Sequence, residues 1–306
     1  MGYKLAGCDV LGGVEIDPRM SALYVANHKP KHEYVEGVQD FCARPDASLP
    51  SELFELDVLD GSPPCSTFSM AGSREGKWGK ATHFREGQAV QVLDDLFGQF
   101  LLVAAKLQPK VVIAENVKGM LAGNAKGYVR EVLAGFKAMG YEPQLFLVDA
   151  SCAGVPQKRE RVVFVARRND LGLKPLQLSL DEAPIGLKSA GASPHQGGGK
   201  QLGQSVLRAW HAVKPGRLLK DARPDGSLYT VRRSSPDLPA YTVTATASLL
   251  HWSEPRTLTS GEVVRASTFP DDYDFLDEDA TYVCGMSVPP FLMQRVALAI
   301  REQWTG

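Results

Sequence analysis

The first 170 residues predict an α/β domain with a mostly parallel sheet. Two observations support this prediction. Short apolar runs alternate with segments whose apolar residues recur every three or four positions, as strands and helices do in such domains. In addition, acidic, amide or glycine residues directly follow several of the apolar runs, and open α/β sheets bind their ligands at the carboxyl ends of strands.

The regular structure is predicted to begin with a strand and a helix. Residues 10–17 form an apolar run that ends in acids, which is typical of a buried strand. Residues 18–27 are predicted as a helix, because Asp17 suits the N-cap and Pro18 suits the first helical position. Gly12 and Gly13 lie inside the predicted strand, where glycines usually serve close packing. The later elements are predicted as a strand over 54–59, a helix over 88–106, a strand over 111–114, a helix over 129–139 and strands over 144–148 and 162–165.

The character of the chain changes after residue 168. Residues 169–258 hold many Pro, Gly, Ser and Thr and show weaker periodicity. Between Arg208 and Arg233, seven Lys or Arg stand against two Asp, with Tyr241 and Trp252 nearby. Such a stretch is often only a solvated face, although it also suits contact with nucleic acid. Residues 288–303 are predicted as an amphipathic helix that closes the chain.

Composition excludes several classes of protein. The 34 Lys and Arg nearly cancel the 35 Asp and Glu, so the whole protein has no basic footprint, although a local one remains open. No run of 18 uninterrupted apolar residues is present, which argues against a membrane span, and residues 1–11 lack a signal-peptide core. The five scattered cysteines show neither a disulfide framework nor zinc-ligand spacing. We therefore expect a cytoplasmic protein without a metal site.

Three short segments carry residues with catalytic chemistry. They are Gly61-Ser62-Pro63-Pro64-Cys65-Ser66, Glu115-Asn116-Val117 and Gln157-Lys158-Arg159-Glu160-Arg161, each at or beside the end of a predicted strand. A thiol, a carboxylate and guanidinium groups that converge at one sheet edge would suit attack on an electron-poor heterocycle. The thiolate would add to the ring, the carboxyl group would bind a ring nitrogen, and an arginine would hold a carbonyl oxygen.

The order and spacing of these segments resemble the C5-cytosine-specific DNA methyltransferase family. Pro64-Cys65 is similar to its nucleophile motif, Glu115-Asn116-Val117 to its acid motif, and Gln157-x-Arg159-x-Arg161 to its arginine motif. Further matches are Glu15-Ile16-Asp17, Asp40-Phe41, Thr257-Leu258-Thr259, Phe269-Pro270-Asp271-Asp272-Tyr273 and Ser287-Val288-Pro289-Pro290. The resemblance implies a Rossmann-like, S-adenosylmethionine-dependent methyltransferase fold with a smaller target-recognition domain.

The resemblance also implies a role for each matching catalytic residue. Cys65 would attack C6 of a cytosine that has been flipped out of the DNA duplex. Glu115 would contact N3 and the exocyclic amine, and Arg161 would hold O2, with Arg159 supporting the site. The activated C5 would take the methyl group, and loss of the C5 proton would release Cys65.

S-adenosyl-L-methionine is the methyl donor that the resemblance implies. Glu15, with Ile16 beside it, would hold the ribose hydroxyls, and Asp40 would receive the adenine amino group next to Phe41. The remaining residues expected to line the donor pocket are Pro64, Leu96, Ser287 and Val288.

The implied domain division has three parts. Residues 1–168 would be the catalytic domain, 169–256 the target-recognition domain, and 257–306 a return to the catalytic domain with the closing helix. Double-stranded DNA is the expected partner, a cognate restriction enzyme is a possible companion, and the source would be a bacterium or phage. The basic residues expected to contact phosphates are Arg208, Lys214, Arg217, Lys220, Arg223, Arg232 and Arg233.

The chain departs from the family pattern at two places. Met286 precedes Ser287 where the family usually has Asn, and the opening strand with its Phe-x-Gly-x-Gly donor loop is missing. Residues 2–10 already resemble the end of the helix that follows that loop. We expect a truncated reading frame, a second chain that supplies the strand, or an inactive protein, and truncation is the favoured explanation. The alternative functions are an RNA cytosine-5 methyltransferase of the same fold and an inactive DNA-binding or regulatory homologue.

Overall fold

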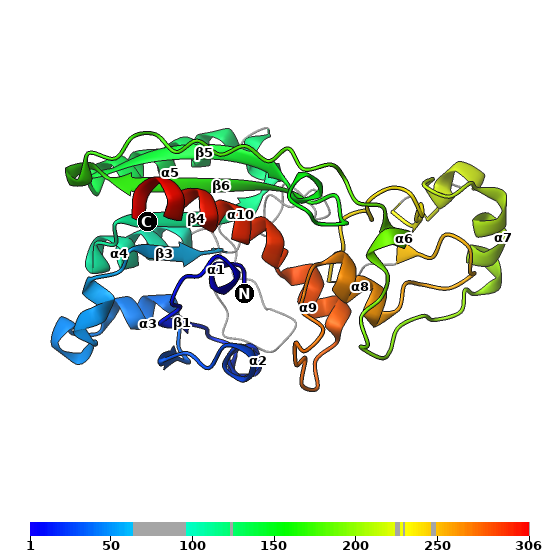
Figure 1. Cartoon of the computed structure of the whole chain (residues 1–306), viewed down its shortest axis with the longest axis horizontal. Coiled ribbons are helices and arrows are strands. Elements are labelled where there is room, and N and C mark those ends of the chain that lie inside the picture. The colour runs from blue at the N-terminus through cyan, green and yellow to red at the C-terminus, as the bar shows by residue number, and fades with distance from the viewer. Residues whose placement is uncertain (64–95, 123–124, 224–226, 229, 246–248, 306) are drawn as a thin grey trace. The chain divides into compact units, whose positions relative to one another are not determined.

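The computed structural model describes residues 1–63, 96–122, 125–223, 227–228, 230–245 and 249–305, which belong to two compact units (Figure 1). The first, here called the sheet unit, comprises Val10–Val148, Glu160–Leu178 and Ala299–Gly306. The second unit comprises Met1–Asp9, Asp149–Arg159 and Ser179–Leu298. The chain therefore passes between the units several times, and this division differs from the three sequential parts that the sequence suggests. The assignment of catalytic and DNA-reading roles to those parts stays a prediction.

The main sheet lies in the sheet unit and has the strand order β3-β4-β6-β5. Its strands are β3 (Val58–Gly61), β4 (Val111–Val117), β5 (Tyr141–Asp149) and β6 (Glu160–Arg168). β3 and β4 are parallel, whereas β6 is antiparallel to β4. The first four residues of β4 are fully buried, as expected for a central strand covered on both faces.

A separate parallel pair, β1 (Gly12–Val14) and β2 (His32–Tyr34), completes the strands of the sheet unit that the structure describes. Gly12 lies so close to β2 that a Cβ on it would stand 2.2 Å from the carbonyl oxygen of His32. Its role as a packing glycine is thus confirmed. With this pair, the α/β class and the mostly parallel strand pairing predicted from the sequence are confirmed.

Four helices of the sheet unit pack against these strands. They are α2 (Pro18–His28), α3 (Val38–Ala43), α4 (Leu96–Leu107) and α5 (Ala125–Ala138). The predicted N-cap of α2 is confirmed, because the side chain of Asp17 accepts the backbone N–H of Arg19 at 2.9 Å. The core between the helices and the sheet is built on aromatic rings, with Phe97 of α4 edge-on to Phe164 of β6 at 5.7 Å between centroids.

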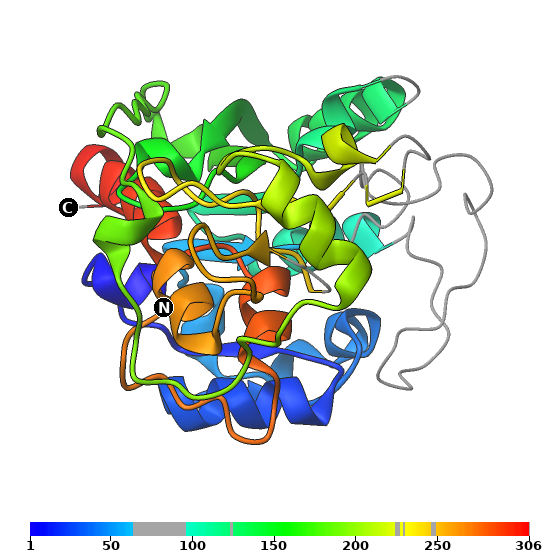
Figure 2. The ribbon, with the colours of Figure 1, turned by 90° about the vertical axis from the view of Figure 1, so that its right-hand side faces the viewer.

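The second unit is made mainly of short helices. They are α1 (Gly2–Leu5), α6 (Leu187–Ala190), α7 (Gln204–Ala212), α8 (Ser260–Ala266), α9 (Ala280–Met286) and the larger part of α10 (Pro290–Ile300). A two-stranded parallel pair, β7 (Arg232–Arg233) and β8 (Leu249–Leu250), lies in the same unit. The predicted helical character of the first residues is confirmed by α1, which lies beside α10 in both Figure 1 and Figure 2. Gln294 of α10 donates to the carbonyl of Leu5 at 3.0 Å.

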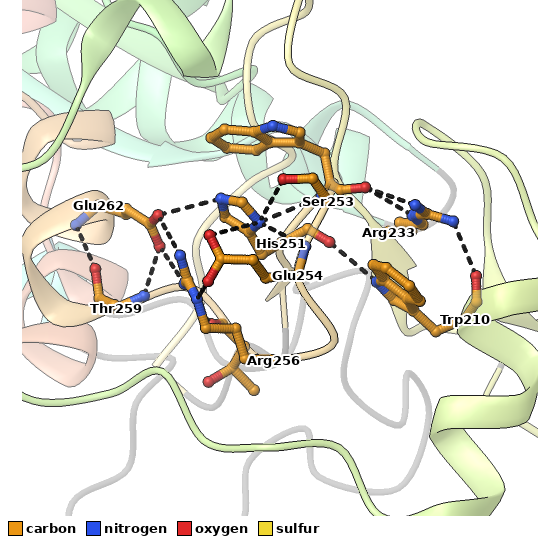
Figure 3. Close-up of polar contacts among 10 residues, drawn as sticks. Trp210, Arg233, His251, Ser253, Glu254, Arg256, Thr259 and Glu262 are labelled. Atoms are coloured by element: carbon orange, nitrogen blue, oxygen red, sulfur yellow. Dashed lines mark hydrogen bonds and ion pairs between the residues drawn. The ribbon is translucent and has the colours of Figure 1, made fainter.

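A buried histidine organises the turn after β8 (Figure 3). Nδ1 of His251 accepts the backbone N–H groups of Ser253 at 3.2 Å and Glu254 at 3.0 Å, so the ring proton lies on Nε2. Nε2 lies 3.4 Å from Oε1 of Glu262. Arg256 donates two hydrogen bonds, of 2.8 and 2.9 Å, to the same carboxylate. Glu262 also forms a capping box with Thr259, which begins α8. One carboxylate thus joins the turn to the helix.

The run Ala280–Trp304 is long and apolar enough to cross a membrane by length and composition, and 56% of its most apolar window is buried. α9 ends at Met286 and α10 begins at Pro290, so this run is interrupted rather than one straight helix. Burial and interruption together favour core helices.

Candidate active site at the carboxyl edge of the sheet

Glu115 and Arg161 meet where β4 ends. Because β6 runs antiparallel to β4, its second residue, Arg161, lies opposite Val117 at the carboxyl end of β4. From there Nε of Arg161 reaches Oε1 of Glu115 at 2.7 Å. The structure therefore brings together two residues that are 46 positions apart and that the sequence assigns to one site.

The pair is shielded from solvent. The side chains of Arg161 and Glu115 are 12% and 9% exposed. Burial lowers the pKa of the Arg161 guanidinium, and the carboxylate of Glu115 acts in the opposite direction. An arginine guanidinium ordinarily titrates far above the physiological pH range, so the group stays charged at neutral pH. Removing one member of such a pair leaves the other charge buried without its partner, which typically lowers the free energy of unfolding by about 3–5 kcal/mol.

Asn116 connects β4 to the end of β3. Its side chain is buried, donates from Nδ2 to the carbonyl of Pro63 at 3.0 Å, and accepts the N–H of Val117 at 2.8 Å. Both hydrogen bonds are made to backbone groups, so the amide fixes the exit of β3 against the exit of β4. The sequence presents Asn116 only as a member of the motif Glu115-Asn116-Val117, and no local pattern predicts its contact with Pro63.

The last residue of β3 must be a glycine. A Cβ on Gly61 would stand 2.4 Å from the ring of Phe100 in α4, which a larger residue would have to displace. A glycine at this position therefore lets β3 pack closely against α4. Two residues later comes Pro63, which is buried. Pro64 and Cys65, the expected donor contact and nucleophile, lie outside the described residues.

Glu15 and Ile16 follow β1 directly, at the carboxyl end of that strand. Oε1 of Glu15 accepts the backbone N–H of Asp17 at 2.8 Å. Burial is the main cause that raises the pKa of the Glu15 carboxyl group; the hydrogen bond from Asp17 lowers it, and the nearby Asp17 charge raises it. A further hydrogen-bond donor on a ligand would therefore stabilise the charged form of the Glu15 carboxyl group.

Asp40 and Phe41 lie in α3, which follows β2, and they differ in exposure. Asp40 is exposed in the first turn of the helix, while Phe41 is buried and edge-on to Tyr34 at 4.8 Å between ring centroids. The ring of Phe41 belongs to the core, so its contribution to a pocket is support. Leu96 is the first residue of α4 and is half-buried. These residues and Glu15 all belong to the sheet unit.

Arg159, Ser287 and Val288 belong to the second unit. Arg159 is 3% exposed and donates to the carbonyl groups of Val243 at 2.6 Å and Gly285 at 2.9 Å. Ser287 ends α9, where its hydroxyl group donates to the carbonyl of Val283 at 2.7 Å. Both of these hydrogen bonds of Arg159 are made to backbone carbonyls, which suits a supporting role.

Arg233, one of the residues expected to contact phosphates, is engaged within the fold (Figure 3). Its Nε and Nη2 both donate to the carbonyl of Trp252, and Nη1 donates to the carbonyls of Trp210 and Val213, at 2.7–3.0 Å. The guanidinium also lies 3.7 Å from the Trp210 ring centroid. The contact of Arg233 with phosphate stays a prediction, and positive charge in the sequence does not reveal that backbone carbonyls already accept hydrogen bonds from its donors.

Within the described ranges, no group of three or more His, Cys, Asp or Glu side chains is placed to hold a metal ion.

The chain matches known DNA methyltransferases over almost its whole length. Residues 1–302 match the family of C-5 cytosine-specific DNA methylases. The type II methyltransferase M1.HphI of Haemophilus parahaemolyticus is 29% identical over 326 residues, covering 100% of this chain and 84% of the relative. M.FnuDI of Fusobacterium nucleatum is 27% identical, with 100% and 91% covered.

Solved structures show the same fold. A prophage-encoded E. coli protein described as a DNA modification methyltransferase superposes with a TM-score of 0.74 at 18% identity, covering 100% of this chain and 95% of its own. The Dnmt2 methyltransferase of S. pombe gives a TM-score of 0.60 at 15% identity, with 98% and 94% covered. The sequence match over residues 1–302 goes further than the fold and shows that the chain belongs to the C-5 cytosine-specific DNA methylase family.

Proposed function

We propose that this chain transfers a methyl group from S-adenosyl-L-methionine to C5 of a cytosine in double-stranded DNA. The observation that carries the proposal is the shielded Glu115–Arg161 pair at the carboxyl edge of the sheet, 2.7 Å apart. Asn116 ties this edge to Pro63, and Cys65 follows Pro63 by two residues in the sequence. Family membership supplies the reaction class that these groups suit.

The roles follow from the chemistry of cytosine. The Cys65 thiolate forms a bond to C6, and the electron pair of the C5–C6 double bond makes C5 nucleophilic. Glu115 binds N3 and the exocyclic amine, and Arg161 binds O2, where negative charge develops. After C5 is methylated, its proton is lost, the double bond re-forms and the bond from sulfur to C6 breaks. A base in a duplex must be flipped out before these groups can reach it.

The donor, when bound, supplies the methyl group, and the residues of this chain fit its polar and apolar parts. Glu15 and Ile16 end β1 in the sheet unit, and the partly buried carboxylate of Glu15 suits a pair of ribose hydroxyl groups. Asp40 offers an exposed carboxylate for an amino group, supported by the buried Phe41. The other residues that we propose for the donor pocket are Pro64, Leu96, Ser287 and Val288.

We further propose that activity requires one more parallel strand, between β1 and β3. Leu11 and Glu15 bond to β2, so the alternation of a parallel ladder turns the backbone groups of Gly12 and Val14 to the other side of β1. No strand in the described part of the chain pairs with that side or joins β1 to β3. The strand would come from residues outside the described part of the polypeptide or from a second chain.

The DNA contacts are proposed to come mainly from residues 169–256, which hold the exposed basic side chains. The exposed candidates for phosphate contacts are Arg208, Lys214, Arg217 and Lys220, and the half-buried candidates are Arg223, Arg232 and Arg233. The relatives named above are bacterial type II methyltransferases, which supports a cytoplasmic protein that acts beside a cognate restriction enzyme.

Labelled methyl transfer tests this function. The chain, alone and with a donor-loop strand from a relative fused upstream, is incubated with tritiated S-adenosyl-L-methionine and either duplex DNA or RNA of the same sequence. Nucleoside analysis should find label in 5-methylcytosine from DNA, and Cys65→Ser should abolish it. Label that enters RNA alone would favour the RNA enzyme, and none from the strand-restored protein in either substrate would refute methyl transfer.

A further inference from the structure

The motif Gln157-x-Arg159-x-Arg161 crosses the boundary between the two compact units. Residues up to Arg159 belong to the second unit, and Glu160 begins the next segment of the sheet unit. Gln157 and Arg159 are buried while Lys158 is exposed, which is the alternation of an extended chain. The third member, Arg161, pairs with Glu115 in the sheet unit. The motif thus has two members in one unit and one in the other.

An extended segment of the second unit pairs with this motif. The N–H of Lys158 donates to the carbonyl of Ala240 at 2.8 Å, and the N–H of Ala240 donates to the carbonyl of Pro156 at 2.9 Å. Thr242 adds a bond from its hydroxyl group to the carbonyl of Lys158 at 2.8 Å. Ala240 therefore lies opposite Gln157 in a parallel bridge.

Two side chains of the motif hold the backbone of Val243 at both of its polar groups. Oε1 of Gln157 accepts the N–H of Val243 at 3.1 Å, and Nη1 of Arg159 donates to its carbonyl at 2.6 Å. Gln157 is 0% exposed and Arg159 is 3% exposed, so both bonds are made without competition from solvent. Val243 is itself fully buried, while Thr244 next to it is exposed.

The other ends of both side chains are anchored in helices of the second unit. Nη2 of Arg159 donates to the carbonyl of Gly285 in α9 at 2.9 Å. Nε2 of Gln157 donates to the hydroxyl group of Ser267, which ends α8, at 3.2 Å. Because a guanidinium presents its donors in one rigid plane, Arg159 fixes two carbonyls relative to each other, which a lysine cannot do.

We propose that Gln157 and Arg159 are positioning residues for DNA recognition, which set the register of residues 240–244 against the chain that carries Arg161. The inference rests on the proposed function. Lys158 and Thr244 are exposed on the paired segments, and a cation and a hydroxyl group are the side chains that contact DNA backbones. The bonds of Gln157 and Arg159 to Val243, here called the clamp, hold the segment that carries Thr244 beside Lys158, which lies three residues before Arg161 in the sequence. The residues proposed for recognition and for chemistry thus share one stretch of chain.

Substitutions of Arg159 and Arg161 should therefore have opposite effects: the first should impair DNA binding, and the second should impair the rate of the chemical step. Arg159→Met should weaken binding to the target duplex about tenfold and lower discrimination against a one-base-pair variant by a similar factor. Its single-turnover rate at saturating DNA should fall far less than that of Arg161→Ala, which should instead lose rate and keep affinity. Arg159→Lys should recover part of the discrimination, because it retains one donor.

Arg167→Met is the matched control. Arg167 lies on β6, where its guanidinium donates to the carbonyl of Leu173 at 2.9 Å and to Gln144 at 3.2 Å. This variant should lower the Tm without changing DNA discrimination. The target duplex is chosen by bisulfite sequencing of DNA that the parent protein has methylated.

Hydrogen–deuterium exchange of the 306-residue chain reads the clamp without DNA. Arg159→Met and Gln157→Met should each speed exchange in the peptide that contains Val243, and Arg167→Met should not. Unchanged exchange there, or an Arg159→Met protein whose DNA binding matches that of Arg167→Met, overturns the inference. The parent protein and its variants carry the added strand in the methylation and DNA-binding assays. If the 306-residue chain shows the expected exchange but the strand-restored parent methylates no cytosine, the proposed function is overturned instead.

Discussion

Glu115 and Arg161 form an ion pair with each other when no substrate is present. The carboxyl group of Glu115 suits N3 and the exocyclic amine of a cytosine, and the guanidinium of Arg161 suits its O2. Their separation of 2.7 Å means that the two proposed catalytic groups are already in contact without a ligand. The pair is also shielded, so charge stabilisation there is not weakened by water. When a cytosine enters, Glu115 and Arg161 would give up part of their ion pair and contact N3, the exocyclic amine and O2 of the base instead.

Removing either charge should slow the chemical step. Glu115→Gln and Arg161→Ala are each expected to lower the single-turnover rate by about 10²-fold or more, the usual effect of losing a charge-stabilising group. Affinity for S-adenosyl-L-methionine, measured by calorimetry, should change little. A variant that loses donor affinity while its single-turnover rate stays normal would show that the residue belongs to the donor pocket.

Asn116 should act on Cys65 through Pro63. Asn116→Asp keeps the shape and the acceptor for Val117 but removes the donor to the Pro63 carbonyl, which is 3.0 Å away. A misplaced reacting group costs up to about 10²-fold in rate, so adduct formation should slow by about tenfold or more at unchanged donor affinity. Asn27→Asp changes the same kind of bond, to the carbonyl of Leu23, and serves as the control. Equal rates for the two variants would remove Asn116 from the positioning of the nucleophile.

His251 should give the protein an acid-sensitive stability. Burial is the main cause that lowers its pKa below 6.5, with the charge of Arg256 acting in the same direction and Glu262 opposing. A base whose folded pKa is depressed stabilises the fold fully above its unfolded pKa, and this contribution is lost as the pH falls. We expect the Tm to fall as the pH drops from about 6.5. His251→Gln should flatten that dependence, whereas the exposed His211→Gln should leave it intact; an unchanged slope in His251→Gln would contradict the assignment.

At the scale of elements, local sequence patterns located most of the regular structure of the sheet unit. The helix predicted over 18–27 is α2, and the strands predicted over 111–114 and 162–165 are the buried centres of β4 and β6. Capping residues and long apolar runs carry this information within a few neighbouring positions. The ends of the elements are less accurate, since β6 extends over Glu160–Arg168.

The sequence could not show how the strands pair. The antiparallel direction of β6 is what brings Arg161 to Glu115, and no local pattern records the direction of a strand relative to a distant one. The motifs placed both residues at strand ends, but the contact itself comes from topology. The same holds for Gln157 and Arg233, whose partners are backbone groups far along the chain.

An added strand should join the two sheets of the sheet unit. Fusing the donor-loop strand of a relative upstream, or adding it as a second chain, should raise the Tm and tighten binding of S-adenosyl-L-methionine. The gain arises because the backbone groups of Gly12 and Val14 on the open side of β1 would form ladder hydrogen bonds with the added strand, each worth about 0.5–1.5 kcal/mol. Calorimetry of the two forms provides the measurement. Equally tight binding by the 306-residue chain would show that another segment performs the work of the loop.

At the scale of the whole molecule, both compact units are built from segments of the chain that lie far apart in sequence. The chain leaves the second unit at Arg159 and enters the sheet unit at Glu160, within the motif that carries Arg161. The match to C-5 cytosine-specific DNA methylases spans both units, since it covers residues 1–302. In the reaction that we propose, residues at the sheet edge carry out the chemistry and residues of the second unit contact the DNA.

Trapping of a covalent adduct tests that reaction most directly. A duplex with 5-fluorocytosine at the target position should form a stable complex with the strand-restored protein in the presence of S-adenosyl-L-methionine, because fluorine at C5 cannot leave as a proton does. Mass spectrometry of the digested complex should place the modified base on Cys65, and Cys65→Ser should form no adduct. An adduct at another residue, or normal methylation by Cys65→Ser, would contradict the account.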